Sequence, residues 1–274
     1  MKFSATVTLQ YDTPFSPFSA AEYVQGLDWI KASGLEGAEL CISHYNGLDL
    51  GLVKAQLEER GLSCSTISTG QARGLEGLSL TGVSQDLQEK TQQRFRQHID
   101  AAAYLGSKVT IGLMRGGGSV STAQEDLKAL REAMLPLADY ASQKGVTLLL
   151  EAINRYETAM LNSAEATLDF VVHSLGNPDC VGILWDVFHA NIEDIEFRRS
   201  IDAMGKKLQH VHLADSNRKF PGYGHLDIAG VLKYIEDSGY GEYASFECLN
   251  LPSVKAVREE TGPWVASVRA VSEG

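Results

Sequence analysis

Long apolar runs are missing from this sequence of 274 residues. A helix that spans a bilayer needs about 20 apolar residues in a row, and no uninterrupted run comes close to that length. The opening residues, MKFSATVTLQYDTPF, also lack the apolar core of a secretory signal peptide. We therefore expect no contact with a membrane and predict a cytoplasmic protein.

Cysteine is scarce as well: the chain has four, and no two of them have C-x-x-C spacing. This spacing argues against both a zinc knuckle and a redox-active pair. Cys41, Cys64 and Cys248 lie in apolar segments with strand character, where a free thiol behaves as a small hydrophobic side chain. Unpaired cysteines are typical of a reducing compartment.

Basic residues are outnumbered, since 24 Lys and Arg face 35 Asp and Glu and give a formal net charge of −11. Nucleic-acid binding depends on Lys and Arg that neutralise phosphates, so we expect no nucleic-acid partner. This charge does not exclude a small neutral sugar or a single sugar phosphate as the ligand. The hydrophobic share of 44% is enough for a large buried core.

Short apolar segments alternate with amphipathic helical patterns along the whole chain. Such alternation is typical of a parallel sheet, and the count and length favour closure into a (β/α)8 TIM barrel over an open doubly wound sheet. Because no linker or low-complexity stretch interrupts the pattern, residues 1–274 are predicted to form a single α/β barrel domain. The predicted strands are Phe3–Leu9, Gly37–Ser43, Ser63–Ser68, Lys108–Met114, Val146–Glu151, Val181–Val187, Leu208–Ala214 and Tyr243–Leu249.

Two predicted helices contain residues that are typical of helix ends or that disturb a helix interior. Thr122 and Glu125 form a predicted capping box for the helix that Gly145 ends. Pro136 lies inside this helix and predicts a kink or a break, because proline removes a backbone donor. The last predicted helix is expected to be interrupted near Pro263 in the same way.

Consecutive strands in the second half of the chain each end in a side chain that can bind a metal ion. One carboxylate at a strand end is often only a solvated charge or a helix N-cap. Matching ends on neighbouring strands, however, would meet at the C-terminal mouth of a barrel, where barrel enzymes keep their chemistry. The four residues are Glu151, Asp186, His212 and Glu247.

Three carboxylates in an apolar tube repel one another strongly, and a divalent cation would neutralise them. Three carboxylates with a single imidazole suit Mn²⁺, Mg²⁺ or Co²⁺, and Zn²⁺ would also be compatible. His210 shares a face with His212 in the same strand, and we interpret it as a hydrogen-bonded interior histidine.

The phrases around these residues carry a family resemblance, strongest over residues 146–250. They are Glu151-Ala-Ile-Asn-Arg-Tyr-Glu157, Trp185-Asp-Val-Phe-His-Ala-Asn-Ile-Glu-Asp194, His210-Val-His-Leu-Ala-Asp-Ser-Asn-Arg218, Pro221-Gly-Tyr-Gly-His225 and Phe246-Glu-Cys248. The set resembles the xylose isomerase-like TIM barrel superfamily of sugar isomerases and epimerases, and within it the D-tagatose/D-psicose 3-epimerase group. The first half of the chain resembles the family only in its alternation of strands and helices.

The resemblance implies a role for each matching position. One divalent metal ion, with Mn²⁺ favoured, would be bound by Glu151, Asp186, His212 and Glu247. Glu151 and Glu247 would also be the catalytic acid–base pair. Contacts to sugar oxygens would come from Glu157, His189 and Arg218. Such barrels are often homo-oligomers, although no interface can be read from the sequence.

The implied function is a metal-dependent ketose 3-epimerase, which inverts C3 through an enediolate. One glutamate removes the C3 proton and the other returns a proton to the opposite face. Related metal-dependent activities stay open: an aldose–ketose isomerase, a hydroxypyruvate isomerase or an inosose dehydratase. More remote alternatives are a nuclease of the endonuclease IV type and a non-catalytic sugar-binding barrel.

The segment Met114-Arg-Gly-Gly-Gly118 leaves open whether the substrate carries a phosphate group. Successive glycines can present backbone N–H groups to an anion, and Arg115 and Arg73 could add positive charge, which would fit a ketose phosphate. A mobile loop at the barrel mouth explains the glycines equally well, so the role of Gly116–Gly118 is undecided. His44 and Tyr45 follow the second predicted strand and are further candidates to line the pocket.

Overall fold

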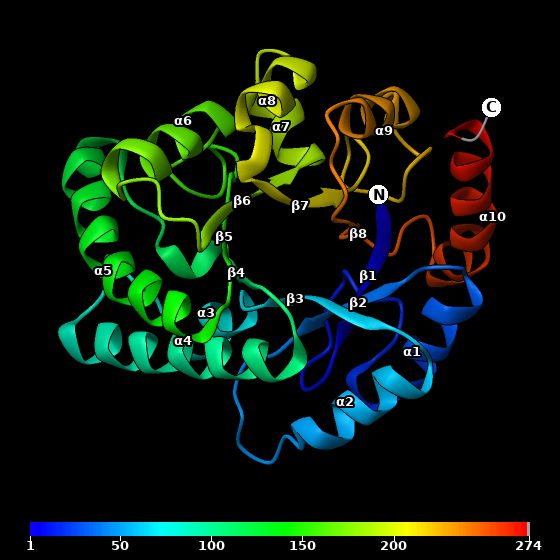
Figure 1. Ribbon diagram of the computed structural model, residues 1–274, viewed down its shortest axis with the longest axis horizontal. Coiled ribbons are helices and arrows are strands. Elements are labelled where there is room, and N and C mark those ends of the chain that lie inside the picture. The colour runs from blue at the N-terminus through cyan, green and yellow to red at the C-terminus, as the bar shows by residue number, and fades with distance from the viewer. Residues whose placement is uncertain (273–274) are drawn as a thin grey trace.

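A closed barrel of eight parallel strands, in sequence order, forms the centre of the computed structural model, which describes residues 1–272 (Figure 1). The predicted TIM barrel and all eight predicted strands are confirmed. The fourth strand is shorter than predicted, because a 3-10 turn at Leu113–Arg115 takes over its end. The strands are β1 (Lys2–Thr8), β2 (Gly37–Cys41), β3 (Ser63–Ser68), β4 (Val109–Ile111), β5 (Leu148–Glu151), β6 (Val181–Asp186), β7 (Leu208–Leu213) and β8 (Tyr243–Phe246).

Helices surround the barrel on its outside, and the two longest, α4 and α5, lie side by side (Figure 1). None of the helices in the described part of the chain has both the length and the apolar character needed to cross a bilayer. The helices are α1 (Tyr23–Ala32), α2 (Leu50–Glu59), α3 (Gln71–Glu76), α4 (Gln85–Leu105), α5 (Ala123–Lys144), α6 (Ala164–Asp169), α7 (Val187–Glu193), α8 (Phe197–Met204), α9 (Ile228–Asp237) and α10 (Val254–Ser272).

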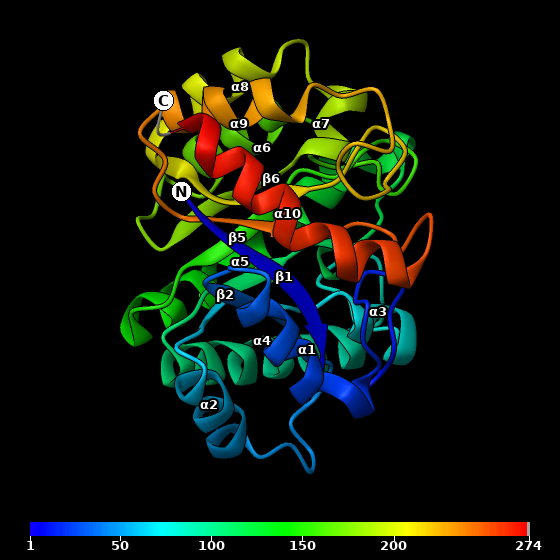
Figure 2. The ribbon, with the colours of Figure 1, turned by 90° about the vertical axis from the view of Figure 1, so that its right-hand side faces the viewer.

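The last helix, α10, packs beside the first strand, β1 (Figure 2). Trp264 of α10 meets the ring of Phe3 edge-on at 6.0 Å between centroids, and that of Phe246 at 5.3 Å. Edge-to-face pairs of this kind add to the gain from burying aromatic surface. This cluster covers the junction at which β1 and β8 close the barrel.

The helix-breaking predictions for the two prolines are wrong. Both α5 and α10 continue through their internal proline. Proline removes one hydrogen bond, but the buried side chains of Met134 and Leu137 on either side of Pro136 keep α5 against the barrel. The predicted capping box is also wrong, because the Thr122 hydroxyl donates to Asp126 at 2.6 Å and does not cap the backbone.

The two faces of the barrel wall differ in chemistry. Side chains that point outward are apolar and pack against the helices, while several inward side chains are polar and buried. The hydroxyls of Thr66 and Thr110 lie 3.0 Å apart on neighbouring strands. Glu39 of β2 contacts His212 of β7, and because these strands are not neighbours, the contact crosses the barrel interior. The interior therefore supports polar residues beneath the mouth.

Candidate active site

The four predicted metal ligands meet at the C-terminal ends of β5 to β8. One ligand atom from each of Glu151, Asp186, His212 and Glu247 lies within 4.8 Å of the others. Nδ1 of His212 is 3.6 Å from Glu151 Oε1, 3.7 Å from Asp186 Oδ2 and 3.3 Å from Glu247 Oε2. Consecutive parallel strands bring their ends to one rim, which explains why residues far apart in sequence converge.

These residues fit a divalent cation. Nδ1 of His212 is buried and has no hydrogen-bond partner among the described residues, although three carboxylates surround it. Metal–ligand bonds of about 2.1 Å at right angles would hold neighbouring ligand atoms roughly 3 Å apart, close to the observed spacing. Burial works to lower the pKa of His212, but the charges of Glu39 and Glu247 raise it well above its usual value. A cation would neutralise this negative field.

Arg218 enters the same cluster from the loop that follows β7. Its guanidinium donates to Asp186 Oδ2 at 2.8 Å and also to Glu247 Oε2. Burial alone would raise the pKa of Asp186, but the charges of Arg218 and His189 outweigh it and hold this pKa below its ordinary value. Arg218 has a φ of 62°, a left-handed conformation that costs energy for a residue with a side chain.

A cavity of about 250 Å³ opens directly above the cluster, and both glutamates of the cluster line it. The predicted substrate-binding residues Glu157, His189 and Arg218 line the same cavity. His189 is buried, with Nε2 3.9 Å from Glu151 Oε1 and 3.8 Å from Asp186 Oδ2. Glu151, Glu157, His189, Arg218 and Glu247 therefore line one cavity, while Asp186 and His212 belong to the cluster of ligands beneath it.

Asn154 orients two of these residues and was not predicted. Its side-chain amide donates to Glu157 Oε1 at 3.1 Å and lies 2.7 Å from His189 Nδ1. Its side-chain oxygen accepts from the backbone N–H of Tyr156, which fixes the orientation of the amide group. Asn154 is part of the sequence phrase from Glu151 to Glu157, but nothing in the sequence indicates which side chains it joins.

Glu39 is a second residue that sequence reasoning missed. It is fully buried in β2, and its carboxylate lies 3.1 Å from Nε2 of both His210 and His212. Burial alone would raise the pKa of Glu39, but the charge of His212 and the hydrogen bonds from both imidazoles hold it well below its usual range. The interpretation of His210 as a hydrogen-bonded interior histidine is confirmed.

The candidate anion-binding residues have other partners. The Arg115 guanidinium is fully buried and donates to the carbonyl oxygens of Glu151, Met160 and Leu161. Arg73 donates to the Ser79 hydroxyl at 3.1 Å. Arg115 therefore supports the backbone at the end of β5 and is not free to bind a phosphate.

The suggestion that His44 and Tyr45 line the pocket is wrong. Neither is among the residues that line the cavity above the cluster. The Tyr45 hydroxyl lies 2.8 Å from His98 Nδ1 on α4, and His44 bonds to Gln10. From the first half of the chain, the loop after β1 contributes to the cavity instead, through Thr13 and Phe15.

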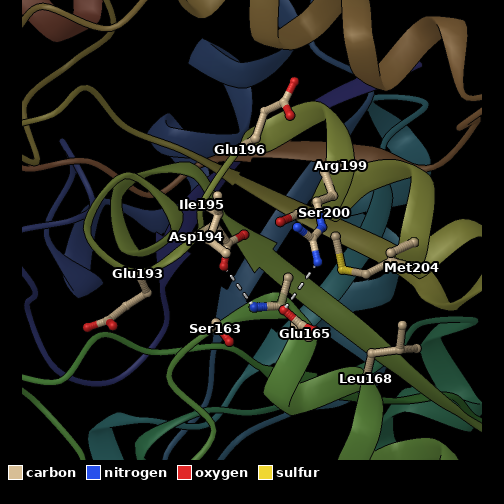
Figure 3. Close-up of a pocket in the computed structure, with 12 residues that line it drawn as sticks. Ser163, Glu165, Leu168, Glu193, Asp194, Ile195, Glu196, Arg199, Ser200 and Met204 are labelled. Carbon is tan, nitrogen blue, oxygen red and sulfur yellow. Dashed lines mark hydrogen bonds and ion pairs between the residues drawn. The ribbon is translucent and has the colours of Figure 1, made fainter.

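A separate hollow of about 350 Å³ lies between α6 and α8 on the outside of the barrel (Figure 3). None of the four clustered ligands lines it. Asp194, at its edge, accepts from the backbone N–H of Ala164 and from Trp185 Nε1, each at 2.9 Å (Figure 3 shows the first bond). Asp194 therefore connects the start of α6 to the barrel wall.

Comparisons with known proteins agree with this architecture. A Methylomonas sp. (strain DH-1) protein named L-ribulose 3-epimerase is 27% identical over 233 residues, which cover 84% of this chain and 79% of that protein. The Escherichia coli (strain K12) 3-dehydro-D-guloside 4-epimerase is 24% identical over 257 residues, or 87% of this chain and 92% of that protein. A solved structure of L-ribulose 3-epimerase superposes with a TM-score of 0.81 at 21% identity, covering 99% of this chain and 97% of that one.

A family model described as xylose isomerase-like TIM barrel matches residues 27–269. This match spans most of the chain and includes the cluster of ligands, most of the residues that line the cavity and the barrel wall from β2 to β8. The chain therefore belongs to the xylose isomerase-like TIM barrel family.

Proposed function

We propose that this protein is a metal-dependent ketose 3-epimerase, in which Glu151 and Glu247 are the acid–base pair. The observation that carries the proposal is the position of the two carboxylates. Each approaches His212 Nδ1 from a different strand, at 3.6 and 3.3 Å, and both line the cavity that would hold the substrate. Two carboxylates facing one small space suit removal of a proton from one face of a carbon and delivery to the other.

The proposed ligands are Glu151, Asp186, His212 and Glu247, with Mn²⁺ as the favoured ion. A divalent cation held by them supplies Lewis-acid stabilisation of the negative charge that develops next to the carbonyl. One glutamate takes the C3 proton, and the electron pair of the broken C–H bond moves toward the C2 carbonyl to give an enediolate. The other glutamate, protonated at the start, delivers its proton to the opposite face of C3, and both carboxyl groups then exchange protons with water.

The remaining cavity residues are proposed to hold the sugar in place. Arg218 stays protonated and can bind oxygens on which negative charge develops. His189 and Glu157 are joined through Asn154, so their polar atoms present a fixed pattern to hydroxyl groups. A volume of about 250 Å³ falls below the range of about 300–1,000 Å³ that drug-sized ligands occupy, which favours a small ketose.

Relatives support a carbohydrate epimerase. Proteins named L-ribulose 3-epimerase, ketose 3-epimerase and D-psicose 3-epimerase are among those similar to this chain. We infer the C3 reaction for this chain from these names together with its own pair of glutamates. A cytoplasmic location fits a substrate drawn from sugar metabolism.

The test is incubation of the Mn²⁺-loaded protein with single ketoses in D₂O, followed by NMR of the products. D-fructose, D-psicose, D-tagatose and L-ribulose form a first panel. We expect the C3 epimer, with deuterium at C3. An aldose, with deuterium at C1 of the remaining ketose, would indicate an isomerase instead, and loss of water would indicate a dehydratase.

A second candidate is a 4-epimerase that acts beside a C3 ketone in a keto-glycoside. This candidate is supported by the Escherichia coli 3-dehydro-D-guloside 4-epimerase, because its similarity to this chain extends over 92% of that protein. The same two glutamates would act on a proton adjacent to a carbonyl, so the active-site chemistry is shared. Deuterium at C4 of a 3-keto-glycoside, without any at C3 of the ketoses, would identify this reaction.

A further inference from the structure

Glu39 is a carboxylate that both interior histidines, His210 and His212, share. It lies in the middle of β2 and has no exposed surface. Oε2 is 3.1 Å from His210 Nε2, and the two carboxylate oxygens are 3.1 and 3.2 Å from His212 Nε2. No oxygen of Glu39 belongs to the group of four ligands at the barrel mouth.

This contact decides which nitrogen of His212 carries the proton. A carboxylate only accepts, so His212 must donate its Nε2 proton to Glu39. When the ring loses its other proton as a cation binds, Nδ1 presents a lone pair, and it is this atom that faces Glu151, Asp186 and Glu247. Without the acceptor at Nε2, a proton on Nδ1 could bond to Glu247, and the ring could no longer bind a cation.

His210 holds the carboxylate from the other side. Within residues 1–272, Nδ1 of His210 is buried and has no partner, so the hydrogen bond from Nε2 to Glu39 orients the His210 ring. An amide in place of the carboxylate would offer one oxygen to two imidazoles. Its NH₂ group would then face the Nε2 of one histidine and require that nitrogen to accept, which reverses the tautomer.

We propose that Glu39 is a positioning residue that makes His212 a metal ligand by accepting its Nε2 proton. This inference rests on the metal centre of the proposed function. Glu39 touches neither the cation nor the substrate and acts through the imidazole. Outer partners of this kind change metal affinity by about 10–100-fold when they are lost.

The first test is titration of the metal-free protein with Mn²⁺ by calorimetry, in the wild type and in Glu39→Gln. We expect one ion per chain in the wild type and an affinity about 10–100-fold lower in the variant. Melting temperatures in EDTA monitor the fold independently of the metal. His98→Gln is the matched control, because His98 is an equally buried histidine that bonds to Tyr45 and not to the cluster. Its Mn²⁺ affinity should match the wild type.

The outcomes separate this inference from the proposed function. If the wild type binds no Mn²⁺, the metal centre fails and the role of Glu39 fails with it. If both proteins bind Mn²⁺ equally, only the positioning role is overturned. Two ions per chain would overturn it as well, since Glu39, His210 and His212 would then form a second cation site.

A second measurement needs no variant and decides the question if Glu39→Gln does not fold. In Mg²⁺-loaded protein labelled with ¹⁵N-histidine, NMR reports which ring nitrogen carries the proton. We expect no proton on Nδ1 of His212 and a proton on Nε2 whose resonance is shifted downfield by its hydrogen bond to the Glu39 carboxylate; an Nε2 proton without that shift would overturn the inference. A proton on Nδ1 of His212 would overturn the inference.

Discussion

Gly112 lies against Glu151 so closely that a Cβ at residue 112 would fall 2.5 Å from Glu151 Oε2. Gly112 directly follows β4, the strand that pairs with β5, which ends at Glu151. The approach of the carboxylate leaves no room for a Cβ, so this position requires glycine.

Gly112→Ala is therefore expected to displace the Glu151 carboxylate while leaving the barrel folded. A misplacement of about 1 Å can lower the rate of a catalysed step by about 100-fold, and we expect a loss of kcat of that order. Steady-state kinetics with the preferred ketose and Mn²⁺ titration measure it. Gly74→Ala is the control, because a Cβ on Gly74 meets nothing within 4 Å and its φ is not positive. Equal kcat in both variants would contradict the steric role of Gly112.

The sequence predicts the barrel and the four clustered residues because both depend on local patterns. Alternation of apolar strands and amphipathic helices is visible along the chain, and each ligand stands at the end of its own strand. Topology then brings Glu151, Asp186, His212 and Glu247 together without any knowledge of side-chain packing.

Glu39 and Arg115 were beyond this reasoning for the same physical reason. The partners of Glu39 lie on β7, across the barrel interior, and no periodicity shows which inward side chains meet there. Arg115 stands next to three glycines, which indicates a flexible anion-binding loop, yet its partners are carbonyl oxygens at the end of β5 and in the segment after it. The partners in such long-range polar contacts are determined by the tertiary packing of the barrel, which local sequence patterns do not show.

The acid–base pair can be tested with Glu151→Gln and Glu247→Gln. Each variant loses a group that accepts or donates a proton, so we expect the epimerisation rate to fall by about 10²–10⁴-fold. The remaining glutamate can still exchange the C3 proton of one epimer with solvent, so NMR in D₂O should show exchange without inversion. Metal analysis controls for loss of the ion, since a glutamine oxygen can still be a ligand. Inversion at the wild-type rate in either variant would contradict the assignment.

Arg218 is the cation that joins Asp186 to Glu247. Replacement by methionine leaves buried carboxylates without this partner, a change that costs about 3–5 kcal/mol for a buried pair. We expect Arg218→Met to melt at a lower temperature than the wild type in EDTA, and to gain more from added Mn²⁺. Arg198→Met is the control, because its pair with Asp202 is exposed and such pairs contribute about 0–1 kcal/mol. Equal melting temperatures for Arg218→Met and the wild type in EDTA would contradict this account.

Arg115 is expected to act on stability and not on anion binding. Burial lowers the pKa of Arg115 to about 10, so the group remains charged at neutral pH and its bonds to carbonyl oxygens are charge-assisted. Lysine cannot reproduce the planar set of donors, and we expect Arg115→Lys to lower the free energy of unfolding by about 1–3 kcal/mol in urea. Inorganic phosphate should not change the melting temperature of the wild type. If phosphate stabilised the wild type but not Arg115→Lys, Arg115 would be part of an anion-binding site after all, and this account would be contradicted.

His98 should make the protein less stable in mild acid. It is fully buried on α4, and burial, with a smaller effect of the Arg94 charge, lowers its pKa from 6.5 to about 3. Between these values the unfolded chain binds a proton that the folded protein does not, so stability falls as the pH drops below about 6.5. At pH 5 the loss of unfolding free energy from this one group is about 2 kcal/mol.

His98→Gln has no such proton to bind. Urea unfolding at pH 7.5 and 5.0 should therefore show a loss of unfolding free energy in acid that is smaller in the variant by this amount. Equal losses would mean that His98 is protonated in the folded protein, despite its burial and its bond to Tyr45.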